Sequence, residues 1–248
     1  MARVDLIPVE GLPEVVAGDP LGELISASVG LEDSDVVVIS QKVVSKAEGR
    51  MRALADVAPG RAAADLAQEL DRDPRLVQLV LDESVRVVRA TRGVLIVETA
   101  GGWVCANAGI DESNVPGDGM VTLLPVDADA SARRIRGEIG AAAAKRPAVV
   151  IADSFGRPWR VGQSDVAIGC AGLDPLDDWR GRSDRHGAKL GATVVAVADE
   201  LAAAADLARA KDDGVPATVV RGMGRIVTPD DGPGAAPLRR TESEDLFR

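Results

Sequence analysis

Three short stretches of this chain carry side chains that could hold a metal ion or a phosphate group. The first is Asp153-Ser154, a carboxylate beside a hydroxyl, directly after the apolar run at 148–152. Such a run between breakers is typical of a buried strand, and ligands gather at the carboxyl ends of strands in open α/β sheets. Oxygen donors there suit a hard divalent cation. Alternatively, Asp153 only caps a turn, which Gly156 and Pro158 would force.

The second stretch is the polar loop at 107–117, which holds two carboxylates and two amides within eight positions. Loops of this density either cap their own backbone or hold a ligand. Asp111 could supply a second carboxylate to a cation beside Asp153. Mg²⁺ in proteins is usually bound by one or two carboxylates together with substrate phosphates.

The third stretch follows the expected buried strand at 35–40 and contains Gln41, Lys42 and Lys46. A lysine ammonium neutralises phosphate as a point charge, but the same pattern also fits a solvated helix start. The chain has no GxxxxGK[ST] motif, so a P-loop is excluded.

Composition limits the classes of partner. The net charge of −10 argues against binding duplex nucleic acid or an anionic membrane through a general basic surface. Aromatic residues make up only 2%, which leaves few platforms for stacking bases. Cys105 and Cys170 are expected to be buried thiols, and the lone His186 to be solvated. Neither a signal peptide nor a membrane-length apolar run is evident, so a cytoplasmic location is expected.

Periodicity and punctuation predict alternating helices and strands. Strands are expected at 4–9, 35–40, 85–89, 94–99, 103–106, 120–125, 148–152, 192–198 and 217–220. Helices are expected at 20–29, 61–70, 74–84, 129–144 and 199–210, with Asp19 as the N-cap of the first.

Several long motifs, in order along almost the whole chain, resemble the coenzyme F420-0:γ-glutamyl ligase family. The motifs are GLPE, SQKVVSKAEGR, NAGIDESNV, ADSFGRPWRVGQSDVAIGCAG, VADELAAAADL and EDLFR. The resemblance implies a homodimer of one mixed α/β (α+β) domain at 1–248, which could comprise two subdomains, with mixed or antiparallel sheets and flanking helices. It implies no C-terminal reductase-like domain in this sequence.

The family resemblance also implies an activity. Such enzymes join L-glutamate to coenzyme F420-0, and then to F420-1, with GTP as co-substrate and release of GDP and phosphate. They require Mg²⁺ or Mn²⁺, with K⁺ as a further candidate ion. An acyl phosphate formed from GTP would make the carboxylate electrophilic, so that the protein mainly positions substrates and stabilises charge.

Site residues carry over position by position from this resemblance. Asp111 and Asp153 would bind one divalent ion and Ser154 a second, with Asp111, Asp153 and Lys46 as the catalytic set. Contacts to GTP would come from Leu12, Pro13, Glu14, Val15, Gln41, Lys46, Asn114, Arg209, Lys211 and Gly214. Lys211 departs from the family pattern, which has an acidic metal ligand at that place; either the second ion is held more weakly, or the lysine substitutes its own charge, or Asp212 replaces the ligand. Asp165 is a weaker candidate for positioning substrate or accepting a proton.

Two other interpretations remain open at this stage. The chain could be a non-catalytic nucleotide- or metal-binding module that retains the fold, for which Lys211 is the main support. It could also be a structural dimerisation partner in which Asp111 and Asp153 only cap loops. In that case Mn²⁺ would leave the melting temperature unchanged.

Overall fold

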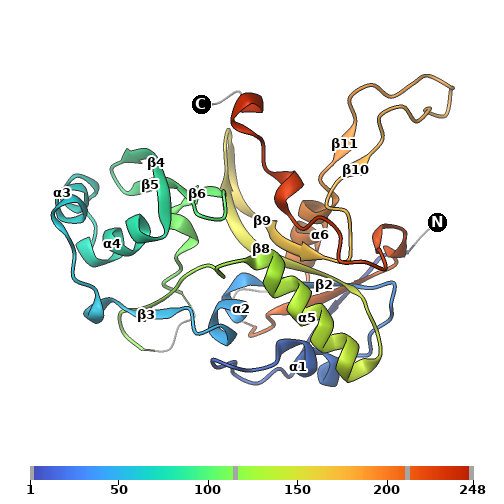
Figure 1. Ribbon diagram of the computed structural model, residues 1–248, viewed down its shortest axis with the longest axis horizontal. Coiled ribbons are helices and arrows are strands. Elements are labelled where there is room, and N and C mark those ends of the chain that lie inside the picture. Colours follow the sequence, from blue (N-terminus) through green and yellow to red (C-terminus); the bar gives the residue numbers. More distant parts are fainter. Residues whose placement is uncertain (1–2, 114–116, 210–212, 246–248) are drawn as a thin grey trace.

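The computed structural model describes residues 3–113, 117–209 and 213–245, and a five-stranded sheet lies at its centre (Figure 1). The strand order is β1-β12-β2-β8-β9; β2 and β8 run parallel and the other neighbouring pairs antiparallel. The strands are β1 (Asp5–Pro8), β2 (Val36–Ser40), β8 (Ala148–Arg157), β9 (Arg160–Ala171) and β12 (Ala217–Arg221). Pro8 lies in β1, which is at the edge of the sheet and pairs only with β12. A proline, which lacks a backbone N–H, is tolerated in such an edge strand.

Helices cover both faces of this sheet. They are α1 (Leu21–Ser28), α2 (Gln41–Ala47), α5 (Ala128–Ala143) and α6 (Val197–Asp206). Alternate residues of β2 explain the two layers: Val37 and Ile39 pack with α1, α2 and α5, whereas Val36 and Val38 pack with α6. Because both faces are buried, β2 and the first half of β8 read as continuous apolar runs instead of alternating ones.

A smaller lobe lies to one side of the sheet, at the left of Figure 1. Its helices are α3 (Arg61–Leu70) and α4 (Pro74–Asp82), and its three-stranded sheet contains β4 (Ser84–Thr91), β5 (Val94–Thr99) and β6 (Val104–Ala106). The short pair β3 (Met51–Ala53) and β7 (Met120–Thr122) lies between this lobe and the central sheet (Figure 1). An arm carries the two-stranded ladder β10 (Asp177–Asp178) and β11 (Val194–Val195), and His186 on it is exposed.

The fold confirms the mixed α/β class, and both cysteines are buried as free thiols. Several local predictions are wrong. The strand expected at 120–125 already ends at Thr122. The strand at 148–152 does not end at Asp153, because β9 pairs with it as far as Arg157. Residues 192–198 form only a two-residue strand before α6 begins at Val197. Asp19 does not cap α1, because its carboxylate accepts a hydrogen bond from the backbone N–H of Val16.

Across the described ranges, none of the helices combines the length and apolar character that crossing a bilayer requires.

Candidate active site

The candidate site lies where the apolar residues of the two parallel strands β2 and β8 end and polar residues follow. In the register of β2 and β8, Ser40 lies opposite Ala152. The next residue of each strand's chain is polar, Gln41 on one and Asp153 on the other. Gln41 is buried, and its side-chain oxygen accepts a hydrogen bond from Ser45 Oγ at 2.9 Å. Its amide group also lowers the pKa of the nearby Asp153 carboxyl group.

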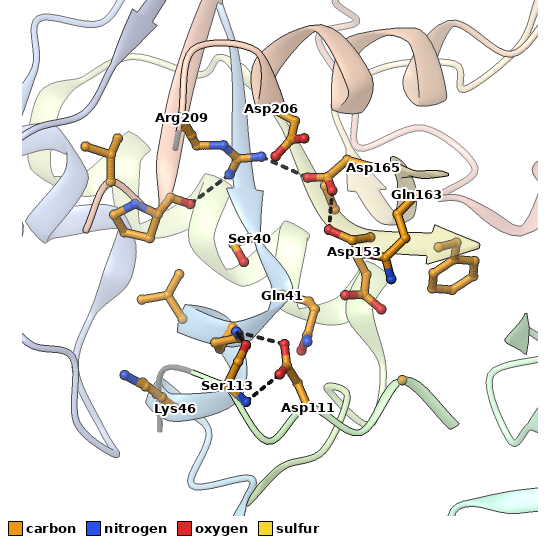
Figure 2. A pocket seen from close by; sticks show the side chains of 18 of the residues that line it. Ser40, Gln41, Lys46, Asp111, Ser113, Asp153, Gln163, Asp165, Asp206 and Arg209 are labelled. Atoms are coloured by element: carbon orange, nitrogen blue, oxygen red, sulfur yellow. Dashed lines mark hydrogen bonds and ion pairs between the residues drawn. The ribbon is translucent and has the colours of Figure 1, made fainter. Parts of the chain in front are cut away.

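A cavity of about 990 Å³ opens above these strand ends (Figure 2). Five segments line it: the loop after β1, the start of α2, the loop at 105–113, the hairpin of β8 and β9, and the chain after α6. Every described residue of the predicted set lines it, namely Leu12, Pro13, Glu14, Val15, Gln41, Lys46, Asp111, Asp153, Ser154, Arg209 and Gly214. Asn114 and Lys211, also predicted, lie outside the described residues, as does Asp212.

Asp111 is held at the cavity wall by a lysine. Lys42 Nζ lies 2.7 Å from Asp111 Oδ2, and the backbone N–H of Ser113 donates to Asp111 Oδ1 at 2.7 Å. Burial alone would raise the pKa of Asp111, but the hydrogen bonds from Lys42 and Ser113 outweigh it and bring the pKa below its usual value. Asp111 is therefore a carboxylate at neutral pH, with Lys42 as its counter-ion.

Asp153 is in the opposite electrostatic situation. Burial raises its pKa to about 7, since it disfavours the charged carboxylate, and the nearby charges of Asp165 and Asp111 raise it further. Hydrogen bonds from the Ser154 backbone and Gln41 only partly offset this. A carboxyl group in this condition is stabilised by any positive charge that enters the cavity.

Asp165 lies directly opposite Ser154 across the hairpin. Ser154 Oγ donates a hydrogen bond to Asp165 Oδ1 at 2.6 Å, and Arg209 Nη2 lies 3.0 Å from Asp165 Oδ2 (Figure 2). The Asp165 and Arg209 side chains are each only 6% exposed, so this is a buried ion pair. Arg209 Nη1 also donates to the carbonyl of Pro216 at 3.1 Å, which closes the loop after α6.

The loop after β1 meets α2 through a second ion pair. Lys46 Nζ lies 2.6 Å from Glu14 Oε1, and the Lys46 side chain is 12% exposed whereas that of Glu14 is 70% exposed. The ammonium group is thus fixed at the edge of the cavity by a partner that can turn into solvent.

Cys105 also lines the cavity, but it is unsuited to nucleophilic catalysis. Burial, with the negative charge of Asp153, raises the pKa of its thiol to about 12. The thiol therefore stays protonated at neutral pH, and the thiolate is the reactive form.

Two charged residues that line the cavity were not predicted as site residues. Lys42 was noted only as one of two lysines after a strand, and its pairing with Asp111 joins segments far apart in the chain. Asp206 lines the cavity at the C-terminal end of α6. An acidic residue is unfavourable at a helix C-terminus because of the helix dipole. This unfavourable placement is the sequence feature that could have indicated a functional role for Asp206.

The carboxylates of the cavity do not by themselves form a complete metal cage. Within the described ranges, no three or more His, Cys, Asp and Glu side chains are grouped closely enough to hold a metal ion. Ser154, whose hydroxyl falls outside that count, adds an oxygen donor beside Asp153.

Fold and cavity together define a mixed α/β protein with an acidic cavity that is flanked by lysines and large enough for a ligand of nucleotide size. The family model described as F420-0:Gamma-glutamyl ligase matches residues 11–222. Three similar curated proteins are each named coenzyme F420:L-glutamate ligase. The protein of Methanothermobacter thermautotrophicus is 45% identical over 251 residues, covering 99% of both chains.

The other two relatives give nearly the same picture. The proteins of Methanopyrus kandleri and Archaeoglobus fulgidus are 42% and 43% identical over 248 residues, covering 99% of this chain and 97% of theirs. The chain therefore belongs to the F420-0:gamma-glutamyl ligase family, and it is a ligase.

Proposed function

We propose that this chain ligates L-glutamate to coenzyme F420-0, and then to F420-1, in the biosynthesis of coenzyme F420. The family membership and the near full-length relatives of that name support the activity. The observation that carries the proposal is that all described residues of the predicted nucleotide and cation sites line one cavity.

GTP is the proposed energy source. The β1 loop at 12–15, together with Gln41 and Lys46, would bind the nucleotide on one side, and the segment from Arg209 through Gly214 on the other. In support, Lys46, whose side chain is 12% exposed, keeps a positive charge at the cavity edge, and its exposed partner Glu14 can release it to a phosphate.

Mg²⁺ or Mn²⁺ is the proposed metal. Asp111 and Asp153 would bind one such ion and Ser154 a second in the same cavity, with phosphate oxygens completing the shells. The raised pKa of Asp153 fits this assignment, because burial, and to a smaller extent the charges of Asp165 and Asp111, disfavour its carboxylate, and a bound cation would offset that cost. When bound, such an ion neutralises charge on the transferring phosphoryl group.

The proposed reaction makes an amide in two steps. A carboxylate oxygen of the deazaflavin substrate attacks the γ-phosphorus of GTP, which releases GDP and leaves an acyl phosphate. The amine of L-glutamate then attacks the acyl carbon, forms the C–N bond, and releases phosphate and a proton. The residues of the cavity hold these groups in line and offset charge, with Lys46 at the phosphates. Neither step needs a protein nucleophile, which agrees with the protonated state of Cys105.

Mass spectrometry of the products tests this function. We expect the purified chain, incubated with F420-0, L-glutamate, GTP and Mn²⁺, to add one or more glutamate residues to F420-0. Continued release of GDP over many turnovers should require both the acceptor and glutamate, because the first step alone stops at the bound acyl phosphate. Binding of GTP and Mn²⁺ by calorimetry with no product would instead identify a non-catalytic module, and ATP in place of GTP tests the nucleotide.

Replacing Lys42 by methionine should tighten the binding of Mn²⁺ while it slows turnover. The variant removes the counter-ion that competes for Asp111. A partly exposed charge pair contributes at most about 1 kcal/mol, so we expect the Kd for Mn²⁺ to fall about fivefold. Electron paramagnetic resonance of free Mn²⁺ measures this.

The matched control is Lys145→Met, since Lys145 pairs with Asp33 on the surface and does not line the cavity. It should leave the Kd unchanged. A Lys42→Met protein that binds Mn²⁺ more weakly would show that Lys42 does not compete with the ion.

A further inference from the structure

Asp165 is a buried acidic residue that the proposed reaction does not yet use. It is 5% exposed and lies in β9, opposite Ser154 of β8. Its two carboxylate oxygens have different partners, Ser154 on Oδ1 and Arg209 on Oδ2. One side chain therefore touches both the strand proposed to hold the cation and the segment proposed to hold the nucleotide.

The contact with Ser154 fixes the direction of the hydroxyl. A serine hydroxyl has one proton and two lone pairs. Because Ser154 Oγ donates its proton to Asp165 at 2.6 Å, its lone pairs are turned away from Asp165. Partners of this kind orient the ligands of metal sites and tune their affinity.

The contact with Arg209 fixes the start of the loop that follows α6. The guanidinium group is bound at both ends, by Asp165 on one side and by the Pro216 carbonyl on the other. Among the described residues, Arg209 Nε is the one buried side-chain nitrogen or oxygen atom without a hydrogen-bond partner. Asp165 is thus the counter-ion of Arg209, and loss of its carboxylate would leave a buried cation unpaired.

We propose that Asp165 is a positioning residue that couples the cation-binding strand β8 to the nucleotide-binding segment after α6. This inference rests on the proposed function. Asp165 acts through Ser154 and Arg209 and not as a metal ligand, in keeping with the finding that no three acidic side chains of the described residues meet around one point. Cation binding and nucleotide binding then depend on the same carboxylate.

The test is a double-mutant cycle read by the binding of Mn²⁺, without turnover. We expect Asp165→Asn to weaken Mn²⁺ binding on the order of tenfold, as loss of such a partner typically does. Ser154→Ala should weaken it to a similar extent, and the double variant no further than Ser154→Ala alone. Non-additivity of this kind is the signature of residues that act through one another.

Asp199→Asn is the matched control for loss of a carboxylate beside β9. Asp199 accepts a hydrogen bond from the backbone of Ala167, two residues from Asp165, and does not line the cavity. Its replacement should leave the Kd for Mn²⁺ unchanged. Equal losses of Mn²⁺ affinity in Asp165→Asn and Asp199→Asn would overturn the proposal, because they would show that loss of any buried carboxylate near β9 disturbs the fold and thereby the cavity.

A second pair of variants keeps the proposal testable if Asp165→Asn alone fails to fold. Asp165→Asn with Arg209→Met removes both buried charges, which such sites tolerate better than one unpaired charge. This double variant should bind Mn²⁺ more weakly than Arg209→Met alone. If Asp165→Asn does fold by itself, it should also bind GTP more weakly, as measured by calorimetry.

The inference and the proposed function fail in different ways. Product formation by the wild-type chain, with Mn²⁺ affinity unaffected by Asp165→Asn or by Ser154→Ala, overturns the inference and leaves the function intact. A wild-type chain that makes no product overturns the function, whereas the binding cycle still decides whether Asp165 positions Ser154.

Discussion

Asp153→Asn should reduce turnover by a factor on the order of 10² to 10³, the usual cost of removing a group that stabilises charge in a transition state. The amide has the size of the carboxyl group but no negative charge for a divalent cation. Asp153 lies at the end of the buried half of β8 and lines the cavity, near the carboxyl groups of Asp111 and Asp165. Initial rates of GDP release, at saturating GTP and Mn²⁺, measure the loss.

The same variant should fold at least as well as the wild type. Burial of the charged carboxylate is unfavourable, as its raised pKa of about 7 reflects, and the neutral amide avoids that cost at pH 8. We expect an equal or higher Tm in the presence of EDTA. Asp65→Asn, on the exposed surface of α3 where it pairs with Arg61, should change neither rate nor Tm. Wild-type turnover in Asp153→Asn would remove Asp153 from the reaction.

The convergence of Asp111 and Asp153 could be predicted from sequence because each signal is local. An apolar run that stops at Asp153 marks the end of the buried half of β8, and a carboxylate-rich loop at Asp111 marks a candidate ligand-binding segment. The family resemblance then linked the two segments, and both side chains do line one cavity. Their roles in binding and catalysis stay predictions.

The pairings inside the cavity could not be predicted in the same way. Lys42 meets Asp111, and Asp165 meets Arg209, across segments that tertiary folding alone brings together. Periodicity reports which face of an element is buried, but it carries no information on which polar side chains will face each other across a cleft.

The wrong element boundaries have equally physical causes. Beyond Asp153, β8 is polar and increasingly exposed, so it lacks the alternation that identifies a strand, although β9 pairs with it. At residues 192–198, a short apolar run precedes an alanine-rich helix, and such runs fit a strand or a buried helix start equally well. Asp19 could have capped a helix or closed a turn, and the turn to Val16 prevailed.

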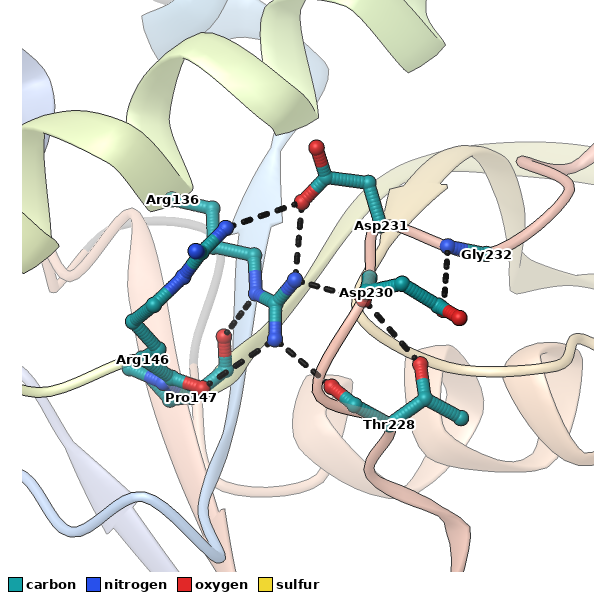
Figure 3. Close-up of polar contacts among 7 residues, drawn as sticks. All are labelled: Arg136, Arg146, Pro147, Thr228, Asp230, Asp231 and Gly232. Atoms are coloured by element: carbon teal, nitrogen blue, oxygen red, sulfur yellow. Dashed lines mark hydrogen bonds and ion pairs between the residues drawn. The ribbon is translucent and has the colours of Figure 1, made fainter.

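Arg136 holds the most extensive buried polar contact outside the cavity (Figure 3). Its side chain, on α5, is fully buried at 0% exposure. Nε donates to the Pro147 carbonyl at 3.0 Å and Nη2 to the Thr228 carbonyl at 2.7 Å. Nη1 donates to the Asp230 carbonyl at 2.6 Å and to Asp231 Oδ1 at 2.7 Å. One guanidinium group thus joins the middle of α5, the residue before β8 and the segment at 228–231.

Arg136→Met should therefore destabilise the fold by roughly 3–5 kcal/mol, because several hydrogen bonds worth about 1 kcal/mol each are lost and buried carbonyls remain unsatisfied. For a chain of this length that corresponds to a fall in Tm of roughly 6–20 °C, measurable by circular dichroism. Arg146→Met is the matched control, since Arg146 contacts the same Asp231 from the surface at 3.3 Å and is 57% exposed. It should cost less than about 1 kcal/mol. Neither arginine lines the cavity. When assayed at temperatures well below the Tm, both variants should therefore keep the wild-type KM for GTP. A similar Tm for the two variants would contradict the structural role of Arg136.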